Sequence, residues 1–128
     1  MVLPLRRRGG RCVKQGLAVA FVLGNLAGIV TSNVALKLSA QATQWSTFLR
    51  WQIAGNLCGF LGVLCFTGLV RHVPLSVGYG ITAGLGFVLV QVVAARLFFG
   101  EAIRPLQWLG VALVVMGIVL IAAGKGRG

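Results

Sequence analysis

Four apolar runs divide the sequence and constrain its fold more than any other feature. They cover about residues 17–38, 51–70, 73–99 and 106–124. A helix needs about 20 mostly apolar residues to cross the hydrocarbon core of a bilayer. With 58% hydrophobic and only 10% charged residues, the chain lacks the polar surface of a soluble domain. We therefore predict an all-α fold, an integral membrane bundle of four transmembrane helices.

The predicted organisation is a single membrane domain, residues 17–124, between two basic ends. These are an N-terminal segment, residues 1–16, and a short tail, residues 125–128. The breaks SAQATQWSTFLR, RHVP and GEAIRP are too short to hold a further domain. A signal peptide cleaved near Ala40-Gln41-Ala42 is the alternative for the first run. That run, however, exceeds the roughly 7–15 apolar residues typical of a signal.

The charge is strongly basic, with 12 Lys and Arg against one acid and a formal net charge of +11. With four spans, both termini lie on the same side of the membrane. Eight basic residues fall on that side and four on the other: Arg6, Arg7, Arg8, Arg11, Lys14, Arg71, Lys125 and Arg127 against Lys37, Arg50, Arg96 and Arg104. The positive-inside rule predicts that both termini lie in the cytoplasm. The expected location is the inner (plasma) membrane. Anionic lipids are expected partners, whereas nucleic acid is not, because the chain is too apolar.

Small residues recur at spacings that allow helices to pack closely. Gly24 and Gly28, Gly55 and Gly59, and Gly80 and Gly84 are each four apart in the first three spans. The fourth span carries glycines seven apart, which leave one face smooth along its length: Gly110, Gly117 and Gly124. Because helices in lipid associate mainly through close packing, the pattern predicts a tight bundle.

The third span holds more glycine than packing on one face requires. Gly78, Gly80, Gly84 and Gly86 are spread over more than one face. One interpretation is a hinge, at which freed backbone groups are satisfied by hydroxyls, water or a ligand. The other is close packing on two sides of the helix.

Polar residues inside the spans predict a chamber between the helices that these residues line. They are costly in lipid and usually face the bundle interior. The candidates for binding a substrate are Asn25, Ser32, Asn33, Lys37, Asn56, Tyr79, Gln91 and Arg96. Hydrogen bonds between helices are the alternative for the amides, and snorkelling to the interface is the alternative for the two basic side chains. The guanidinium group of arginine can donate two parallel hydrogen bonds, which suits a phosphate headgroup.

The second half of the sequence resembles the small multidrug resistance proteins and the related drug/metabolite transporter superfamily. The matching features are the VP entry, GYG with nearby AGLG, the FFGE turn and the last run LGVALVVMGIVLI. The first span matches less well, through SNVALKLS. The resemblance implies a four-helix subunit that works as a dimer. Its first three helices would line a substrate chamber, and Gly110, Gly117 and Gly124 would lie at the dimer interface.

The resemblance fails at one functional position. Drug-exporting members carry a glutamate in the first helix, and this position falls on Ile29 or Asn25 here, neither of which ionises. Glu101 is expected to pair with Arg104 in its own turn, which would leave the chamber without a carboxylate. The aminoarabinose-lipid flippase subunits look similar in lacking the glutamate, in having an amide nearby and in carrying a polyprenyl-phosphate cargo.

The preferred function is transport of a small amphiphile or a lipid-linked anionic headgroup across the inner membrane. A proton-coupled drug or metabolite exporter is one alternative, and an accessory subunit of a larger membrane complex that transports nothing is another. An enzyme is not expected, because the sequence shows no metal cluster, carboxylate pair or nucleophile with a base. No cofactor or metal is expected either. The partner is a related four-helix subunit, identical or different, or a larger complex.

Overall fold

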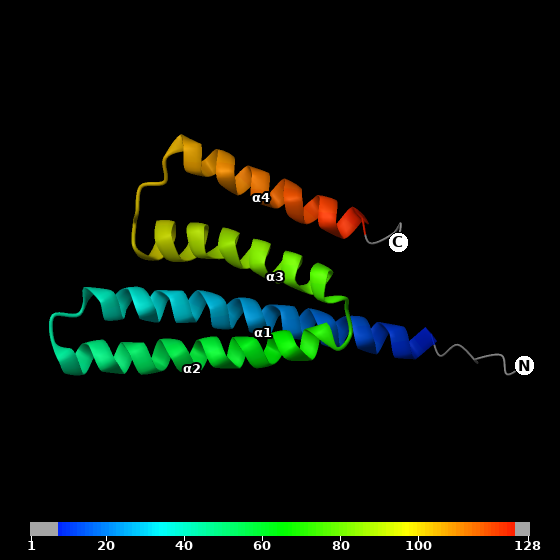
Figure 1. The fold of residues 1–128 in the computed structure, drawn as a ribbon, viewed down its shortest axis with the longest axis horizontal. Coiled ribbons are helices and arrows are strands. Elements are labelled where there is room, and N and C mark those ends of the chain that lie inside the picture. The colour runs from blue at the N-terminus through cyan, green and yellow to red at the C-terminus, as the bar shows by residue number, and fades with distance from the viewer. Residues whose placement is uncertain (1–7, 125–128) are drawn as a thin grey trace, which may run out of the picture.

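The computed structural model describes residues 8–124 and is all-α, which confirms the predicted fold class. Its elements are α1 (Arg8–Gln41), α2 (Trp45–Val70), α3 (Leu75–Leu89), the π-helix η1 (Val90–Phe98) and α4 (Pro105–Gly124). The predictions for residues 1–7 and 125–128, including the tail and four of the basic residues, lie outside the described residues. Helices α1 and α2 form an antiparallel pair, α3 lies beside α1, and α4 covers the outer side of α3 (Figure 1).

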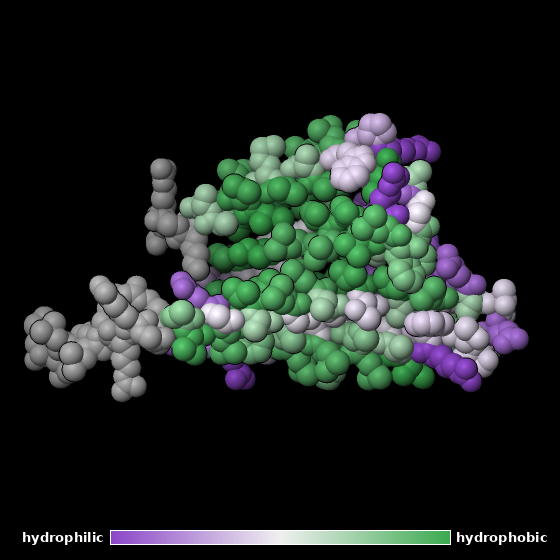
Figure 2. Space-filling view, turned by 180° about the vertical axis from the view of Figure 1, so that it is seen from behind, coloured by the Kyte–Doolittle hydropathy of each residue, from purple (hydrophilic) through white to green (hydrophobic). Residues whose placement is uncertain are grey.

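Four segments of the described chain are long and apolar enough to cross a membrane. They are Cys12–Gln41, Trp45–Val70, Leu75–Phe98 and Pro105–Gly124, the third combining α3 with η1. A hydrophobic band covers the middle of the molecule, and hydrophilic side chains gather at its two ends (Figure 2). The first and last described residues lie at the same end (Figure 1). The four-span membrane protein is therefore confirmed.

The opposite end, where α1 meets α2 and η1 meets α4, carries the aromatic residues typical of a membrane interface. All three tryptophans are exposed within the first two turns of α2 or α4: Trp45, Trp51 and Trp108. Trp45 also stacks on Phe48, with ring centroids 5.2 Å apart. Tryptophan prefers the headgroup level of a bilayer, so we expect this end of the bundle to lie close to the lipid headgroups.

The first connection is much shorter than the sequence predicted. Residues 39–50 were expected to break the helices, yet only residues 42–44 separate α1 from α2. The helices continue past the apolar runs, and polar side chains bond across the turn. The Ser39 hydroxyl donates to the Phe48 carbonyl oxygen at 2.9 Å and lies 3.1 Å from Gln52 Oε1.

Glycines form the seam between α1 and α2. A Cβ atom built on Gly28 would lie 2.7 Å from Gly62 Cα and 2.9 Å from the carbonyl oxygen of Cys58. One on Gly24 would lie 2.7 Å from the Cys65 sulfur. The predicted tight packing is present, and its closest backbone approach involves Gly62, which the four-residue spacing did not single out.

The glycines of α3 meet neighbours on two faces. Gly80 and Gly84 pack against Ile121 and Ile118 of α4. Gly86 faces Ile29 of α1, and Gly78 faces side chains at the end of α2 and in the following turn. Helix α3 is regular through all four positions. Packing on two sides therefore accounts for their spread, and a hinge at these glycines stays a prediction.

The irregular part of the third span comes one turn later. In the π-helix η1, backbone hydrogen bonds join residues that are further apart along the chain than in an α-helix. The same pattern continues at its end, where Phe99 N–H donates to the Ala94 carbonyl at 3.0 Å and Glu101 N–H donates to the Ala95 carbonyl at 2.8 Å. Gly100 has φ +64°, the left-handed conformation that glycine adopts without a steric penalty. The FFGE turn thus reverses the chain and directs Glu101 back toward α1.

Candidate functional site: a groove between α1 and α3

Three hollows lie in a row along α1 and the third span. Their volumes are about 290, 250 and 360 Å³. Ile29 and Ala83 line both the first and the second, and Asn33 and Val90 line both the second and the third. Because neighbouring hollows share lining residues, they adjoin one another, and we refer to the three together as the groove. We call the first the inner hollow and the third the outer hollow.

Asn25, which lines the inner hollow, has a buried polar atom without a partner among the described residues. Asn25 is only 5% exposed, and its Nδ2 donates to the Gly62 carbonyl oxygen at 2.8 Å. Its Oδ1 is buried and accepts no hydrogen bond from any described residue. Leaving such an acceptor unsatisfied costs about 1–3 kcal/mol.

The rest of the inner hollow is mostly apolar or already satisfied. Thr82 is buried, and its hydroxyl donates to the Gly78 carbonyl oxygen at 2.8 Å. Tyr79 is largely exposed and meets Phe66 edge to face, with centroids 6.2 Å apart. The hollow therefore offers an aromatic wall, without a charge among its lining residues.

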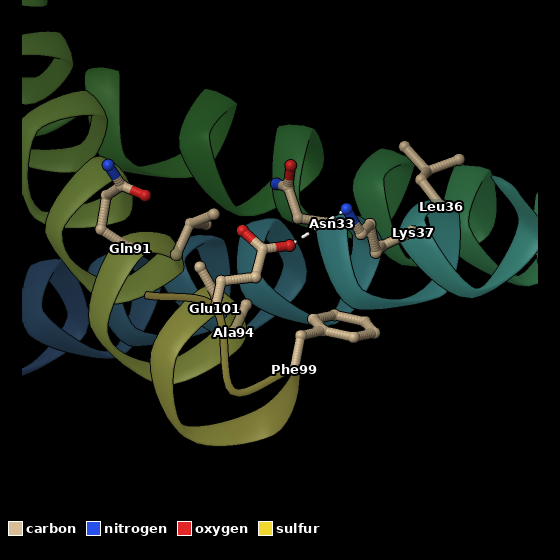
Figure 3. A pocket seen from close by; sticks show the side chains of 9 residues that line it. Asn33, Leu36, Lys37, Gln91, Ala94, Phe99 and Glu101 are labelled. Carbon is tan, nitrogen blue, oxygen red and sulfur yellow. Dashed lines mark ion pairs between the residues drawn. The ribbon is translucent and has the colours of Figure 1, made fainter. Parts of the chain in front are cut away.

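The outer hollow contains an ion pair between distant parts of the chain. Lys37 Nζ lies 3.0 Å from Glu101 Oε1, and the two side chains are 46% and 49% exposed (Figure 3). Asn33 of α1 and Gln91 of η1 line the same hollow. The predicted pairing of Glu101 with Arg104 is wrong, because the Gly100 turn directs the carboxylate toward α1. The expectation that the chamber lacks a carboxylate is wrong for the same reason.

The groove collects five of the eight predicted substrate-binding residues: Asn25, Asn33, Lys37, Tyr79 and Gln91. The other three line none of its hollows. Ser32 packs against Gly59, Asn56 is exposed and bonds back to the Gln52 carbonyl at 2.7 Å, and Arg96 is exposed at the end of η1. Roles for these three in binding stay predictions.

Sequence reasoning missed Glu101 and Phe99 as lining residues of the outer hollow. The signal was present in the FFGE turn, since a glycine directly after a helix often marks a left-handed end that reverses the chain. It also missed Phe66 of α2, because the glycine spacing did not indicate that this face of α2 lines the groove.

One face of α4 has no neighbour in the described chain. A Cβ atom on Gly110, Gly117 or Gly124 would meet nothing within 4 Å. The adjacent face of α4 is engaged, because Ile118 and Ile121 pack on α3. The open face has room for another helix, and its use as a subunit interface stays a prediction.

Residues 18–114 match the family model described as Small Multidrug Resistance protein. The chain belongs to the small multidrug resistance family. As a member, it is a multi-pass membrane transporter and not an enzyme. The resemblance predicted from the GYG, FFGE and last-helix motifs is thus confirmed over most of the sequence.

Curated relatives of this small multidrug resistance protein include flippase subunits. Proteins of Yersinia pseudotuberculosis and Yersinia pestis, each named probable 4-amino-4-deoxy-L-arabinose-phosphoundecaprenol flippase subunit ArnE, are 39% identical over 82 residues, which is 64% of this chain and 70% of theirs. The uncharacterized protein y4nH of Sinorhizobium fredii is 35% identical over 115 residues, 84% of this chain and 97% of its own. No solved structure matches this chain.

Proposed function

We propose that this protein moves an amphiphile with an anionic headgroup, such as a lipid-linked sugar phosphate, across the inner membrane. The observation that carries the proposal is the row of adjoining hollows. Apart from Asn33, its middle hollow is lined by apolar residues such as Ile29, Phe87 and Val90, and it adjoins the outer hollow with its charged and amide side chains. An apolar groove can hold a hydrocarbon chain, and the basic Lys37 with the amide side chains beside it can bind a phosphate.

The relatives support this choice of cargo. Those named as flippase subunits act, by their names, on an arabinose derivative attached to a phosphoundecaprenol. Such a molecule joins a long apolar chain to a phosphate and a sugar, which are the parts that the groove and the outer hollow can accommodate.

A proton-coupled exporter of drug cations fits the groove less well. The two candidates for the glutamate position, Asn25 and Ile29, both line the inner hollow and neither ionises. The one acid of the chain, Glu101, already contacts Lys37 at the other end of the groove. A pH gradient is therefore not expected to drive uptake of a quaternary ammonium into proteoliposomes.

A second subunit completes the proposed transporter. The open face of α4 with Gly110, Gly117 and Gly124 accepts a helix from another chain. The bias of eight basic residues against four favours a single orientation, with both termini in the cytoplasm. Two identical copies in one orientation cannot pair antiparallel, so we propose pairing with a related but oppositely oriented subunit. The word subunit in the names of the Yersinia relatives agrees with an assembly.

The test is movement of a fluorescent phosphatidic acid between the leaflets of proteoliposomes, read as protection from a membrane-impermeant quencher. The protein, with its partner where one co-purifies, should accelerate the movement over empty vesicles. The variants Asn33→Leu and Asn56→Leu form a matched pair. Each asparagine is exposed and bonds to the carbonyl four residues earlier, at 2.8 and 2.7 Å, but only Asn33 lines the groove.

Asn33→Leu should slow the movement several-fold, and Asn56→Leu should leave it unchanged. Equal rates with and without protein would reject transport of this class and favour the accessory subunit. Equal slowing by both variants would show that the groove is not the path.

A further inference from the structure

A further hollow lies beside the connection from α2 to α3, toward the end of the bundle where the described chain begins and ends (Figure 1). Its volume is about 320 Å³, and none of its lining residues lines the groove. Leu69, Val77 and Gly78 form its buried part, whereas Val19 and Leu23 of α1 line it and are exposed. We call it the terminal hollow.

The terminal hollow is entirely apolar. All nine of its lining residues are aliphatic or glycine. They belong to candidate membrane spans or to the turn between two of them, so the exposed side of the hollow faces hydrocarbon. An empty apolar hollow forfeits the dispersion contacts of the atoms that line it. An acyl chain restores these contacts without burying a polar group.

Two basic residues lie beside the terminal hollow. Lys14 precedes the lining residue Ala18 by four positions, so the two share one side of α1. Arg71 lies in the turn between the lining residues Leu69 and Val73. Both basic side chains are exposed. Long basic side chains at the end of a span place their charge at the level of the lipid headgroups.

Aromatic contacts hold the turn that carries Arg71 against α1. The adjacent His72 stacks on Phe21 of α1, with ring centroids 6.2 Å apart. Phe21 also covers Gly68 near the end of α2, where a Cβ atom would lie 2.6 Å from its ring. The cation of α1 and the cation of the turn are therefore kept at the same end of the terminal hollow.

No acidic side chain of the protein neutralises these two cations. The single acid, Glu101, lies at the opposite end of the bundle and contacts Lys37 at 3.0 Å (Figure 1). The balancing anion must therefore come from outside the chain. A lipid headgroup with a net negative charge meets this need, whereas a choline headgroup would add a further cation beside Lys14 and Arg71.

We propose that the terminal hollow is a binding site for an anionic membrane phospholipid. One acyl chain occupies the hollow, and the phosphate lies between Lys14 and Arg71. The lipid belongs to the leaflet on the side of the termini. The site is separate from the groove, so this inference does not depend on the cargo of the transporter.

Native mass spectrometry of the purified protein, released from a mild non-ionic detergent, measures the binding of phosphatidylglycerol and phosphatidylcholine with identical acyl chains. Each Lys or Arg near an anionic headgroup contributes about a fivefold gain in affinity. Phosphatidylglycerol should therefore bind about tenfold tighter or more. Equal binding of the two lipids by the wild type would overturn the proposal.

Charge variants assign this preference to the site. The double variant Lys14→Gln/Arg71→Gln should lower the ratio of the two affinities several-fold. The matched control is Arg50→Gln/Arg104→Gln, which removes two exposed basic side chains from the opposite end of the bundle and should leave the ratio unchanged. An equal effect of both double variants would show that net charge, and not this site, selects the lipid.

A variant that fills the hollow tests the place of the acyl chain. Ala18→Phe should weaken the binding of both lipids, because the ring takes the space of the chain. Unchanged binding of phosphatidylglycerol would overturn the hollow as its site.

Photo-crosslinking identifies the occupant without relying on that variant. A diazirine-bearing residue replaces Val19 in one protein and Leu57 in another, in vesicles with equal amounts of the two lipids. The two positions are 57% and 59% exposed, but Leu57 lines neither the terminal hollow nor the groove. Adducts at position 19 should be enriched in phosphatidylglycerol, and those at position 57 should follow the bulk composition. The same composition at both positions, or a protein adduct at position 19 that reveals a partner helix, would overturn the proposal.

Discussion

Replacing Gly28 by alanine places a methyl group where the backbones of α1 and α2 come closest. The new Cβ would lie 2.7 Å from Gly62 Cα and 2.9 Å from the Cys58 carbonyl oxygen. Both neighbours are backbone atoms, so no side-chain rotation relieves the overlap and the helices must move apart. Overpacking of this kind costs about 1–3 kcal/mol.

The separation also affects the polar site. Asn25 Nδ2 donates to the carbonyl oxygen of Gly62, the residue that the new methyl group displaces. Loss of that bond adds about 0.5–1.5 kcal/mol, and the higher helix propensity of alanine offsets up to about 1 kcal/mol. We expect a net loss of roughly 1–3 kcal/mol in the free energy of unfolding.

The assay is unfolding by sodium dodecyl sulfate in mixed micelles, followed by circular dichroism. The control is Gly16→Ala in the same helix, where a Cβ atom meets nothing within 4 Å. It should leave stability unchanged or raise it slightly. If Gly28→Ala and Gly16→Ala shift the midpoint equally, the close approach at Gly62 does not stabilise the α1–α2 pair and the reasoning fails.

Three further outcomes are expected. Gly117→Leu should separate or rearrange the oligomer by crosslinking and light scattering, because it fills the open face of α4; an unchanged oligomer would count against that interface. Gly100→Ala should lower stability by about 1–2 kcal/mol in the same unfolding assay, because its φ of +64° strains any residue with a Cβ atom; no loss would contradict the proposed turn geometry. A reporter fused to the C-terminus should be detected only in the cytoplasm; an even split between the two sides would restore an antiparallel homodimer.

The sequence by itself determined the membrane class and most of the fold. Four apolar runs separated by short polar breaks leave only spanning helices, because backbone groups in lipid must bond within their own segment. The closely spaced glycines likewise predicted tight packing, which the structure shows at Gly24 and Gly28. These signals are local, since each depends on the neighbours of a residue along the chain.

Only the tertiary structure decided which of these residues meet. Hydropathy and spacing do not predict that Gly28 faces Gly62, that one oxygen of Asn25 has no partner among the described residues, or that Asn33 lines the groove while Asn56 does not. The pairing of Lys37 with Glu101 is the clearest case, because a sequence-local partner, Arg104, was available. The left-handed Gly100 directs the carboxylate toward α1, and the packing of the third span beside α1 brings the lysine within reach.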